Sequence, residues 1–438
     1  MNFENRQVAV LGLGNSGEAA AMLLHRRGAC VTVFDSGQPK LERVQTLRSL
    51  GVSVNVGPVA EEAIGEFDLV VVSPGIDPAV PLFQNLSNHA AMFIGEIELA
   101  FRFCKRPVVA ITGTNGKTTT TQLVEKMLNS AGLRTVACGN IGMPFSEAVE
   151  RQDEFDIFTV EISSFQFETI SSFRPNVAVW LNFTPDHLDR YADLAEYRTA
   201  KLRIFENQQS DDFAVVNFRD ELPEIHARPI RFSAYVKEAD LALSHETICF
   251  RGHPILNIKE TQLMGIHNTE NLMAALGTAF ALQIPWEKAK LGLIEYRPLP
   301  HRCEKVGEIG GVTFINDSKA TNLDALVKAL ESQLKPVVLI AGGKDKGFEF
   351  DSISALVQAK VKHAVLIGEM AERISNSWSS LLPCSIAKTL REAVTIAHQQ
   401  SQPGDTVLFS PGTSSFDMFK GYADRGDQFR QIIQESEK

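Results

Sequence analysis

The stretch that decides the fold is VVAITGTNGKT, from Val108 to Thr118. Val108–Ile111 is a short apolar run typical of a buried strand, a glycine-rich loop follows it, and a helix is predicted from Lys117 onward. Backbone N–H groups at a helix N-terminus bind anions, a lysine adds positive charge, and a threonine hydroxyl is a suitable Mg²⁺ ligand. The stretch therefore predicts that ATP binds and is split at Gly113, Thr114, Asn115, Gly116, Lys117, Thr118 and Thr119.

The loop departs from the common phosphate-loop pattern at one position. That pattern has a glycine six residues before the lysine, where this chain has Ile111, and Gly113 instead stands four residues before it. The Gly-Lys-Thr core between a strand and a helix is intact. We therefore keep the ATP prediction, with a chance turn of this composition as the alternative.

The same unit, an apolar run followed by a polar loop and a helical pattern, recurs along the chain. In residues 1–95, Val8–Leu11 leads into Gly12–Gly17, and the later run Cys30–Phe34 ends in Asp35, which is the pattern of a dinucleotide-binding fold. In residues 300–438, similar strands are predicted at Val337–Ala341, Ala364–Ile367 and Thr406–Phe409.

This repetition predicts an α/β protein with three domains: N-terminal Rossmann-like (1–95), central P-loop ATPase-like (96–299) and C-terminal Rossmann-like (300–438). Prolines at 298 and 300 favour the last boundary. In the central domain, strands are predicted at Ile157–Val160 and Val177–Leu181, and residues 211–260 are expected to be loops and short strands.

Composition narrows the possible partners. The 438 residues are 44% hydrophobic and 22% charged, with a net charge of −10, which argues against a nucleic-acid or anionic-membrane partner. No apolar run reaches the roughly 20 residues of a membrane span, and no basic-then-apolar leader precedes the strand that begins near Gln7. The six cysteines form no CxxC pair, so we expect reduced thiols and a cytoplasmic location.

Three further residues are candidates for the chemistry. Glu161 follows an apolar strand, which favours a magnesium ligand, although it could instead cap the helix predicted near Ser163. His187 has acids on both sides and follows another strand, so it could contact metal or phosphate, or have a structural role. Lys201 falls on a predicted helix, and by itself the pattern indicates a solvated lysine.

Together these motifs resemble the Mur ligases of peptidoglycan synthesis, along essentially the whole chain. The shortened loop Gly-Thr-Asn-Gly-Lys-Thr is itself typical of that family. The other motifs that carry the resemblance are Gly139–Gly142, Glu161–Ser164, Asp186–Asp189, Gly265–Ala275, His301–Arg302 and Asn316–Asn322. The length and the stretch Ser410–Asp417 favour the member that joins D-glutamate to UDP-N-acetylmuramoyl-L-alanine.

The resemblance implies a reaction and its participants. ATP phosphorylates a carboxylate, the amine of the amino acid attacks the acyl phosphate, and phosphate leaves. The implied cofactors are ATP and Mg²⁺, the implied substrates are UDP-N-acetylmuramoyl-L-alanine and D-glutamate, and a monomer is expected. The first domain would then hold a uridine diphosphate sugar in place of NAD, and the third domain would bind the amino acid.

The resemblance also assigns residues to roles. The implied catalytic residues are Lys117, Glu161, His187, Lys201 and Lys319, with Lys201 at the position of a carbamylated lysine. Metal ligands would be Thr118, Glu161, His187 and, if carbamylated, Lys201. Asn271, Arg302 and Asp317 complete the ATP site. The UDP substrate would contact Asn15, Ser16, Asp35, Ser36, Gly75, Asn140 and His187.

The implied D-glutamate residues are Lys319, Thr321, Lys346, Ser415 and Tyr422, and Lys344 could replace Lys346. Separate cationic or donor sites suit the two carboxylates of glutamate. The chain departs from the family at Gly37, where some relatives carry arginine, and at Tyr422, where phenylalanine is usual.

Two alternative functions stay open at this point. One keeps the chemistry and changes the amino acid, to L-glutamate or the substrate of another Mur ligase. The other is a nicotinamide oxidoreductase built on residues 1–95, with the loop at Gly113 binding phosphate passively.

Overall fold

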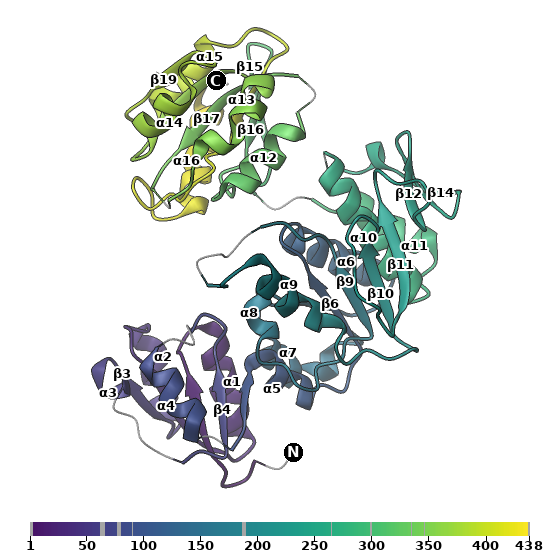
Figure 1. Cartoon of the computed structure of the whole chain (residues 1–438), viewed down its shortest axis with the longest axis vertical. Coiled ribbons are helices and arrows are strands. Elements are labelled where there is room, and N and C mark those ends of the chain that lie inside the picture. The colour runs from purple at the N-terminus through teal and green to yellow at the C-terminus, as the bar shows by residue number, and fades with distance from the viewer. Residues whose placement is uncertain are drawn as a thin grey trace. The chain divides into compact units, whose positions relative to one another are not determined.

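The computed structural model describes residues 3–61, 66–76, 80–89, 91–185, 190–263, 265–297, 300–333, 335–345 and 347–436. Within these residues the chain forms three sheets flanked by helices (Figure 1). Two predicted site residues, His187 and Lys346, lie outside the described residues, as do Pro298 and Leu299 of the predicted boundary. The α/β fold class and the three-domain order are confirmed by this architecture.

The first sheet is parallel, in the order β3-β2-β1-β4-β5. The predicted strands at Val8–Leu11 and Cys30–Phe34 are present as β1 and β2. The strands are β1 Gln7–Leu11, β2 Cys30–Asp35, β3 Ser53–Val56, β4 Leu69–Val72 and β5 Phe93–Gly95. The helices are α1 Asn15–Arg26, α2 Leu41–Ser49, α3 Pro58–Glu61 and α4 Pro81–His89.

The second sheet has the order β14-β13-β12-β11-β10-β9-β6-β8-β7, parallel from β7 to β12 and antiparallel at β12–β14. Its phosphate-loop strand, β6, lies between β8 and β9. The strands are β6 Val108–Thr112, β7 Ala137–Gly139, β8 Phe158–Glu161, β9 Val177–Trp180, β10 Phe213–Asn217, β11 Arg228–Ser233, β12 Leu241–Ser244, β13 Thr247–Phe250 and β14 His253–Asn257. The helices are α5 Glu96–Phe103, α6 Lys117–Ser130, α7 Phe145–Glu150, α8 Ser164–Phe167, α9 Leu194–Leu202, α10 Ile266–Ala281 and α11 Trp286–Glu295.

The third sheet has the order β15-β16-β20-β17-β18-β19, parallel except for the β15–β16 pair. All three strands predicted here are present, as β17, β18 and β20. The strands are β15 Glu304–Ile309, β16 Val312–Asn316, β17 Val337–Gly342, β18 Val361–Ile367, β19 Cys384–Ile386 and β20 Thr406–Phe409. The helices are α12 Leu323–Glu331, α13 Ser354–Lys360, α14 Ala371–Trp378, α15 Leu390–Gln399 and α16 Tyr422–Ser436.

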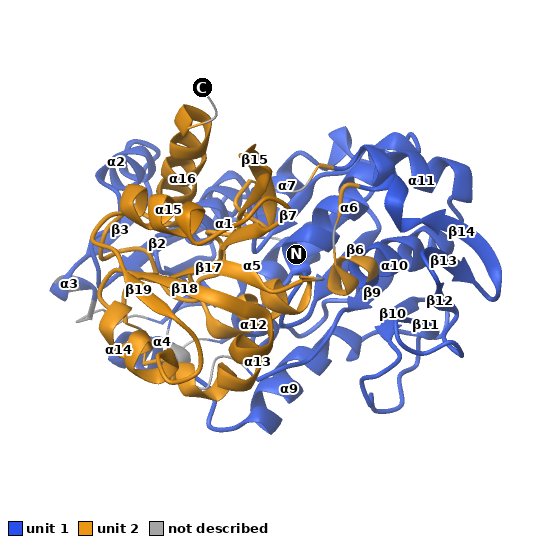
Figure 2. Ribbon diagram, turned by 90° about the horizontal axis from the view of Figure 1, so that it is seen from above, with its two compact units in different colours: residues 1–261, 270–296 blue, residues 262–269, 297–438 orange. Residues whose placement is uncertain are grey.

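The chain divides into two compact units, coloured separately in Figure 2. Residues 1–261 and 270–296 hold the first two sheets, and residues 262–269 and 297–438 hold the third. No helix in the described parts of the chain is long and apolar enough to cross a membrane. The domain boundaries at 95/96 and 299/300 stay predictions.

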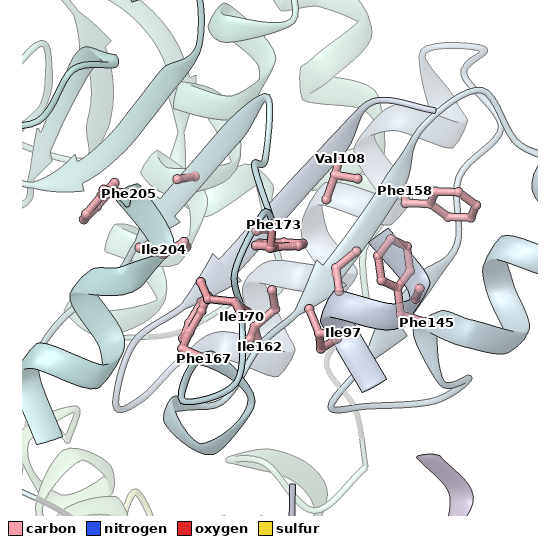
Figure 3. Close-up of a cluster of buried hydrophobic side chains, with 14 of the residues drawn as sticks. Ile97, Val108, Phe145, Phe158, Ile162, Phe167, Ile170, Phe173, Ile204 and Phe205 are labelled. Carbon is pink, nitrogen blue, oxygen red and sulfur yellow. The ribbon is translucent and has the colours of Figure 1, made fainter. Parts of the chain in front are cut away.

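An apolar core under the second sheet holds the strand ends that carry the site. Figure 3 shows Val108 of β6 and Phe158 of β8 in this core, together with Phe145 and Phe173. All four side chains are almost completely buried. Burying a side chain of this kind contributes roughly 1.5–3 kcal/mol. Because both strands are packed in the core, the loops at their carboxyl ends start from fixed positions.

Candidate active site

The glycine-rich loop joins β6 to α6, as the sequence predicts. Gly116 has φ +84°, a backbone conformation that favours glycine, and a Cβ there would lie 2.4 Å from Asn271 Oδ1. The same Asn271 oxygen accepts a hydrogen bond from Thr120 Oγ1 (3.2 Å). The structure therefore brings Asn271, on α10, to the loop that was predicted to bind the same nucleotide.

Two lysines meet at one carbonyl oxygen of this loop. Lys117 Nζ donates to Gly113 O (2.9 Å) and to Thr114 O (2.8 Å). Lys201 Nζ, from α9, also donates to Gly113 O (2.9 Å). Lys201 is only 1% exposed, so the interpretation as a solvated lysine is wrong. Two ammonium groups at a loop of this shape suit a polyanionic ligand.

Glu161, the last residue of β8, lies in register with Ile111 of β6. It is buried, and its Oε1 accepts a hydrogen bond from Asn140 Nδ2 (2.8 Å). Its Oε2 has no hydrogen-bond partner among the described residues. The helix that follows is capped by Ser163 and Gln166, so Glu161 is not its cap.

A buried carboxylate oxygen without a partner costs free energy unless a cation or donor satisfies it. Oxygen ligands of this kind suit Mg²⁺, and Thr118, half-buried at the start of α6, is the other oxygen donor that the sequence predicts in this part of the chain. The donor set therefore fits the implied metal. Among the described residues, no group of three or more His, Cys, Asp or Glu side chains forms a metal cluster.

The first domain places its predicted contacts around the loop after β1. Asp35 accepts hydrogen bonds from Leu13 N (2.6 Å) and Gly37 N (2.8 Å). The carboxylate therefore connects the loop after β1 to the turn after β2. Asn15 is exposed at the start of α1 and bonds Arg43, which also donates to Leu13 O (3.3 Å). Ser16 follows it, and Ser36 and Gly75 lie exposed after β2 and β4.

Arg190 connects the loop that contains Gly75 to the central domain through hydrogen bonds and an ion pair. Its guanidinium donates to Pro74 O (3.4 Å) and Ile76 O (3.2 Å) and pairs with Glu168 (2.7 Å). It also lies 4.3 Å from the centre of the Phe165 ring. A cavity of about 250 Å³ lies here, lined by Val72, Ser73, Pro74, Ile76, Phe83, Phe93, Phe165, Glu168, Thr169 and Arg190.

The second unit carries the remaining predicted residues. Asp317, just after β16, is buried and accepts hydrogen bonds from Ser410 Oγ (2.7 Å) and Cys303 N (3.2 Å). Burial raises its pKa to about 6, although those bonds and the charge of Arg302 act in the opposite direction. Arg302 is half-buried, two residues before the start of β15. The predicted ATP-binding residues are thus divided between the two units.

Lys319 and Tyr422 contact each other across the predicted amino-acid site. Lys319 Nζ lies 3.8 Å from the centre of the Tyr422 ring, a short cation–π contact. Ser415 is buried in the loop after β20, and Thr321 is half-buried in the loop after β16. Lys344, the alternative to Lys346, donates its backbone N–H to Ser414 O (2.9 Å).

Sequence reasoning missed several residues that organise these loops. Asn182 accepts from Asn115 N (2.9 Å) and donates to Asn115 O (3.1 Å), and its polar side chain at the end of an apolar strand was a usable signal. The Tyr197 hydroxyl lies 3.3 Å from Thr114 Oγ1, and its ring lies 4.9 Å from Lys201 Nζ. The spacing of four between Tyr197 and Lys201 on a helix would have indicated this contact.

Comparisons with known proteins match three successive parts of the chain to Mur ligase domains. Residues 6–95 match the Mur ligase MurD-like N-terminal domain, 111–279 the Mur ligase middle domain, and 301–412 the Mur ligase glutamate ligase domain. The protein named UDP-N-acetylmuramoylalanine--D-glutamate ligase from Geobacter sp. (strain M21) is 40% identical over 449 aligned residues, covering 100% of this chain and 99% of that protein. The protein of the same name from Geotalea uraniireducens (strain Rf4) is 42% identical, covering 99% and 98%.

A solved structure shows the same fold at lower identity. UDP-N-acetylmuramate-alanine ligase MurC from Thermotoga maritima superposes with a TM-score of 0.62 at 19% identity, covering 99% of this chain and 100% of that one. The domain matches and the full-length relatives confirm the resemblance inferred from the motifs. With full-length relatives near 40% identity and matches in all three domains, this chain belongs to the Mur ligase family.

Proposed function

We propose that this protein is an ADP-forming amide ligase that adds D-glutamate to UDP-N-acetylmuramoyl-L-alanine in the synthesis of peptidoglycan precursors. The observation that carries the proposal is the meeting of Lys117 and Lys201 at Gly113 O, in the loop predicted to bind ATP. The names of the full-length relatives support the choice of substrates.

The phosphate loop accounts for the first chemical step. The γ-phosphoryl group of ATP is transferred to the alanine carboxylate of the UDP substrate, which forms an acyl phosphate and ADP. Lys117 and the backbone N–H groups at the start of α6 offset the repulsion between the anionic carboxylate and the phosphates. Asn271 accepts a hydrogen bond from Thr120 Oγ1 in the first turn of α6, which helps to fix the start of this helix.

The second step is the attack of the glutamate amine on the acyl carbon, with loss of phosphate. Lys319, Thr321, Ser415 and Tyr422, with Lys346 or Lys344, are proposed to hold the two carboxylates of glutamate so that its amine faces the acyl phosphate. Mg²⁺, held by Thr118, Glu161, His187 and a carbamylated Lys201, would neutralise phosphate charge. The UDP group is proposed to lie against Asn15, Ser16, Asp35, Ser36, Gly75, Asn140 and His187.

The proposed domain roles follow the same division. Residues 1–95 bind the UDP sugar, 96–299 bind ATP, and 300–438 bind the amino acid. The proposed oligomeric state is a monomer, which sedimentation velocity measures directly. The proposed location is the cytoplasm.

Phosphate release under defined conditions tests the function. Release should require ATP, UDP-N-acetylmuramoyl-L-alanine and D-glutamate together, with the product identified by its mass. Lys117→Ala should abolish release. Lys105→Ala, at a lysine outside the loop, serves as the matched control and should behave like the unaltered protein. Full turnover without either carbon substrate would refute the proposal.

Replacing D-glutamate with L-glutamate in the same assay separates the two stereoisomers. Turnover with L-glutamate alone, or with another amino acid of the family, would favour the first alternative. Tight NAD(H) binding, measured by fluorescence, would favour the oxidoreductase alternative.

A further inference from the structure

Three loops of the second unit emerge at one edge of its sheet. Strands β16, β20 and β17 are neighbours and run parallel, so their carboxyl ends lie together. The loop after β16 carries Lys319 and Thr321, the loop after β20 carries Ser415, and the loop after β17 begins at Gly343. The residues proposed to bind glutamate thus depend on how these loops are held against one another.

One buried guanidinium bonds two of these loops. Arg425, in the first turn of α16, is completely buried. Its Nε donates to Ser318 Oγ (3.0 Å) and its Nη2 donates to Ser318 O (2.9 Å), in the loop after β16. Its Nη2 also donates to Thr413 O (3.2 Å), and its Nη1 donates to Ser414 O (3.3 Å), in the loop after β20.

The same guanidinium packs against the third loop. Gly343 has φ +141°, and a Cβ there would lie 3.2 Å from Arg425 Nη1 and 2.3 Å from Ser414 O. Ser414 O also accepts the N–H of Lys344 (2.9 Å). A side chain at residue 343 would therefore push the guanidinium and the loops apart.

Within the described part of the chain, no carboxylate forms an ion pair with this guanidinium, and Asp417 and Asp317 act on it only from further away. Among the residues that the structure describes, no Asp or Glu oxygen lies within 4.0 Å of Arg425, and the four acceptors above are carbonyl and hydroxyl oxygens. Burial lowers its pKa to about 10, while the more distant Asp417 and Asp317 raise it, so the group stays charged at neutral pH. A buried cation bonded only to neutral groups costs stability, and it makes its surroundings favourable for an anion.

We propose that Arg425 is the positioning residue of the amino-acid site. It holds the loops after β16 and β20 so that Lys319 and Ser415 are arranged before the amino acid binds, and it adds positive charge beneath that site. The occupant it favours is an amino acid with two carboxylates. This inference rests on the proposed function and adds a residue to it.

Steady-state kinetics on the full chain test the inference. In Arg425→Lys and Arg425→Ala, KM for D-glutamate should rise at least about tenfold, while KM for ATP and for the UDP substrate should change less than about twofold. Millimolar guanidinium chloride should lower KM for D-glutamate in Arg425→Ala. The control is Arg391→Ala, whose guanidinium pairs with Glu435 near the other end of α16 (2.6 Å) and which should show neither effect.

The outcomes separate this inference from the proposed function. If the unaltered protein releases no phosphate in response to D-glutamate, the proposed function fails. If it does respond, an unchanged KM for D-glutamate in folded Arg425→Lys, or an equal rise in all three KM values, overturns the inference.

A second variant keeps the test decisive if thermal denaturation shows that both Arg425 variants are unfolded. Ser318→Ala removes one acceptor of Arg425 and the hydroxyl that donates to Tyr422 O (2.8 Å). It should raise KM for D-glutamate about threefold, with the other two KM values unchanged. No change in KM for D-glutamate would overturn the inference.

Discussion

Replacing Glu96 with glutamine is expected to stabilise the protein at pH 8 and to stabilise it much less at pH 5. Glu96 begins α5 and is 2% exposed, with Oε1 accepting from Ser146 N (2.6 Å). Glu96 Oε2 and Ser146 Oγ have no hydrogen-bond partner within the described residues. Burial raises the pKa of Glu96 from 4.5 to about 7, although the hydrogen bond from Ser146 N opposes the shift.

The sign follows from where the proton is held. Between pH 4.5 and 7 the unfolded carboxyl loses its proton while the folded one keeps it, so rising pH favours the unfolded state. At about 1.36 kcal/mol per unit of pKa, the carboxyl costs about 3 kcal/mol at pH 8 and about 1 kcal/mol at pH 5. The glutamine variant lacks this pH-dependent free-energy cost, and its amide can donate a hydrogen bond to Ser146 Oγ. The advantage of the variant should therefore grow by about 2 kcal/mol between pH 5 and pH 8.

Urea denaturation of both proteins at the two pH values measures this difference. A Trp378→Phe background leaves Trp180 and Trp286, which both lie in the same unit as Glu96, so fluorescence reports that unit. Other groups that titrate are shared by both proteins and cancel in the comparison. An advantage that is equal at both pH values within about 0.5 kcal/mol would refute the reasoning.

Glu98 provides the matched control, two residues further along α5. Burial by itself raises its pKa, but hydrogen bonds from Ser172 (Oγ, 2.6 Å), Ser171 (N, 3.0 Å) and Arg102 (2.7 Å) more than offset this, and the pKa is lowered. Its stabilising contribution is present above pH 4.5 and is lost only as the pH falls below that value. Glu98→Gln should therefore destabilise the protein equally at pH 5 and pH 8.

Three further predictions concern activity. Lys201→Ala should lower kcat by about 100-fold, and acetate or another short carboxylic acid should restore part of it; no rescue would argue against a carbamate at this position. If the ionised form of Asp317 is needed to bind ATP, kcat/KM for ATP should fall about tenfold per pH unit below the Asp317 pKa of about 6. A pH profile of kcat/KM that is flat down to pH 5 would contradict this. Tyr422→Leu should raise KM for D-glutamate about fivefold because the contact with Lys319 is lost, whereas Tyr422→Phe, which keeps the ring, should stay within about twofold; equal KM values for the two variants would exclude a role for the ring.

Features that are contiguous in the chain could be predicted from the sequence. The strand, glycine-rich loop and helix between Val108 and Ser130 follow one another directly, so residue types and spacing suffice to identify them. The runs that became β1, β17 and β20 were predicted for the same reason, because parallel strands buried on both faces are continuous apolar segments. The order of such units was enough to predict three α/β domains and the family.

Contacts between distant segments were decided only by the tertiary structure. Lys201 is 88 residues from Gly113, and Arg425 is 107 residues from Ser318. In the sequence, both residues lie on helical patterns where solvated basic side chains are common, and composition does not distinguish a buried cation from an exposed one. Only the tertiary packing of α9 and α16 buries these charges and directs them at the loop carbonyls, which lie just beyond the ends of the strands.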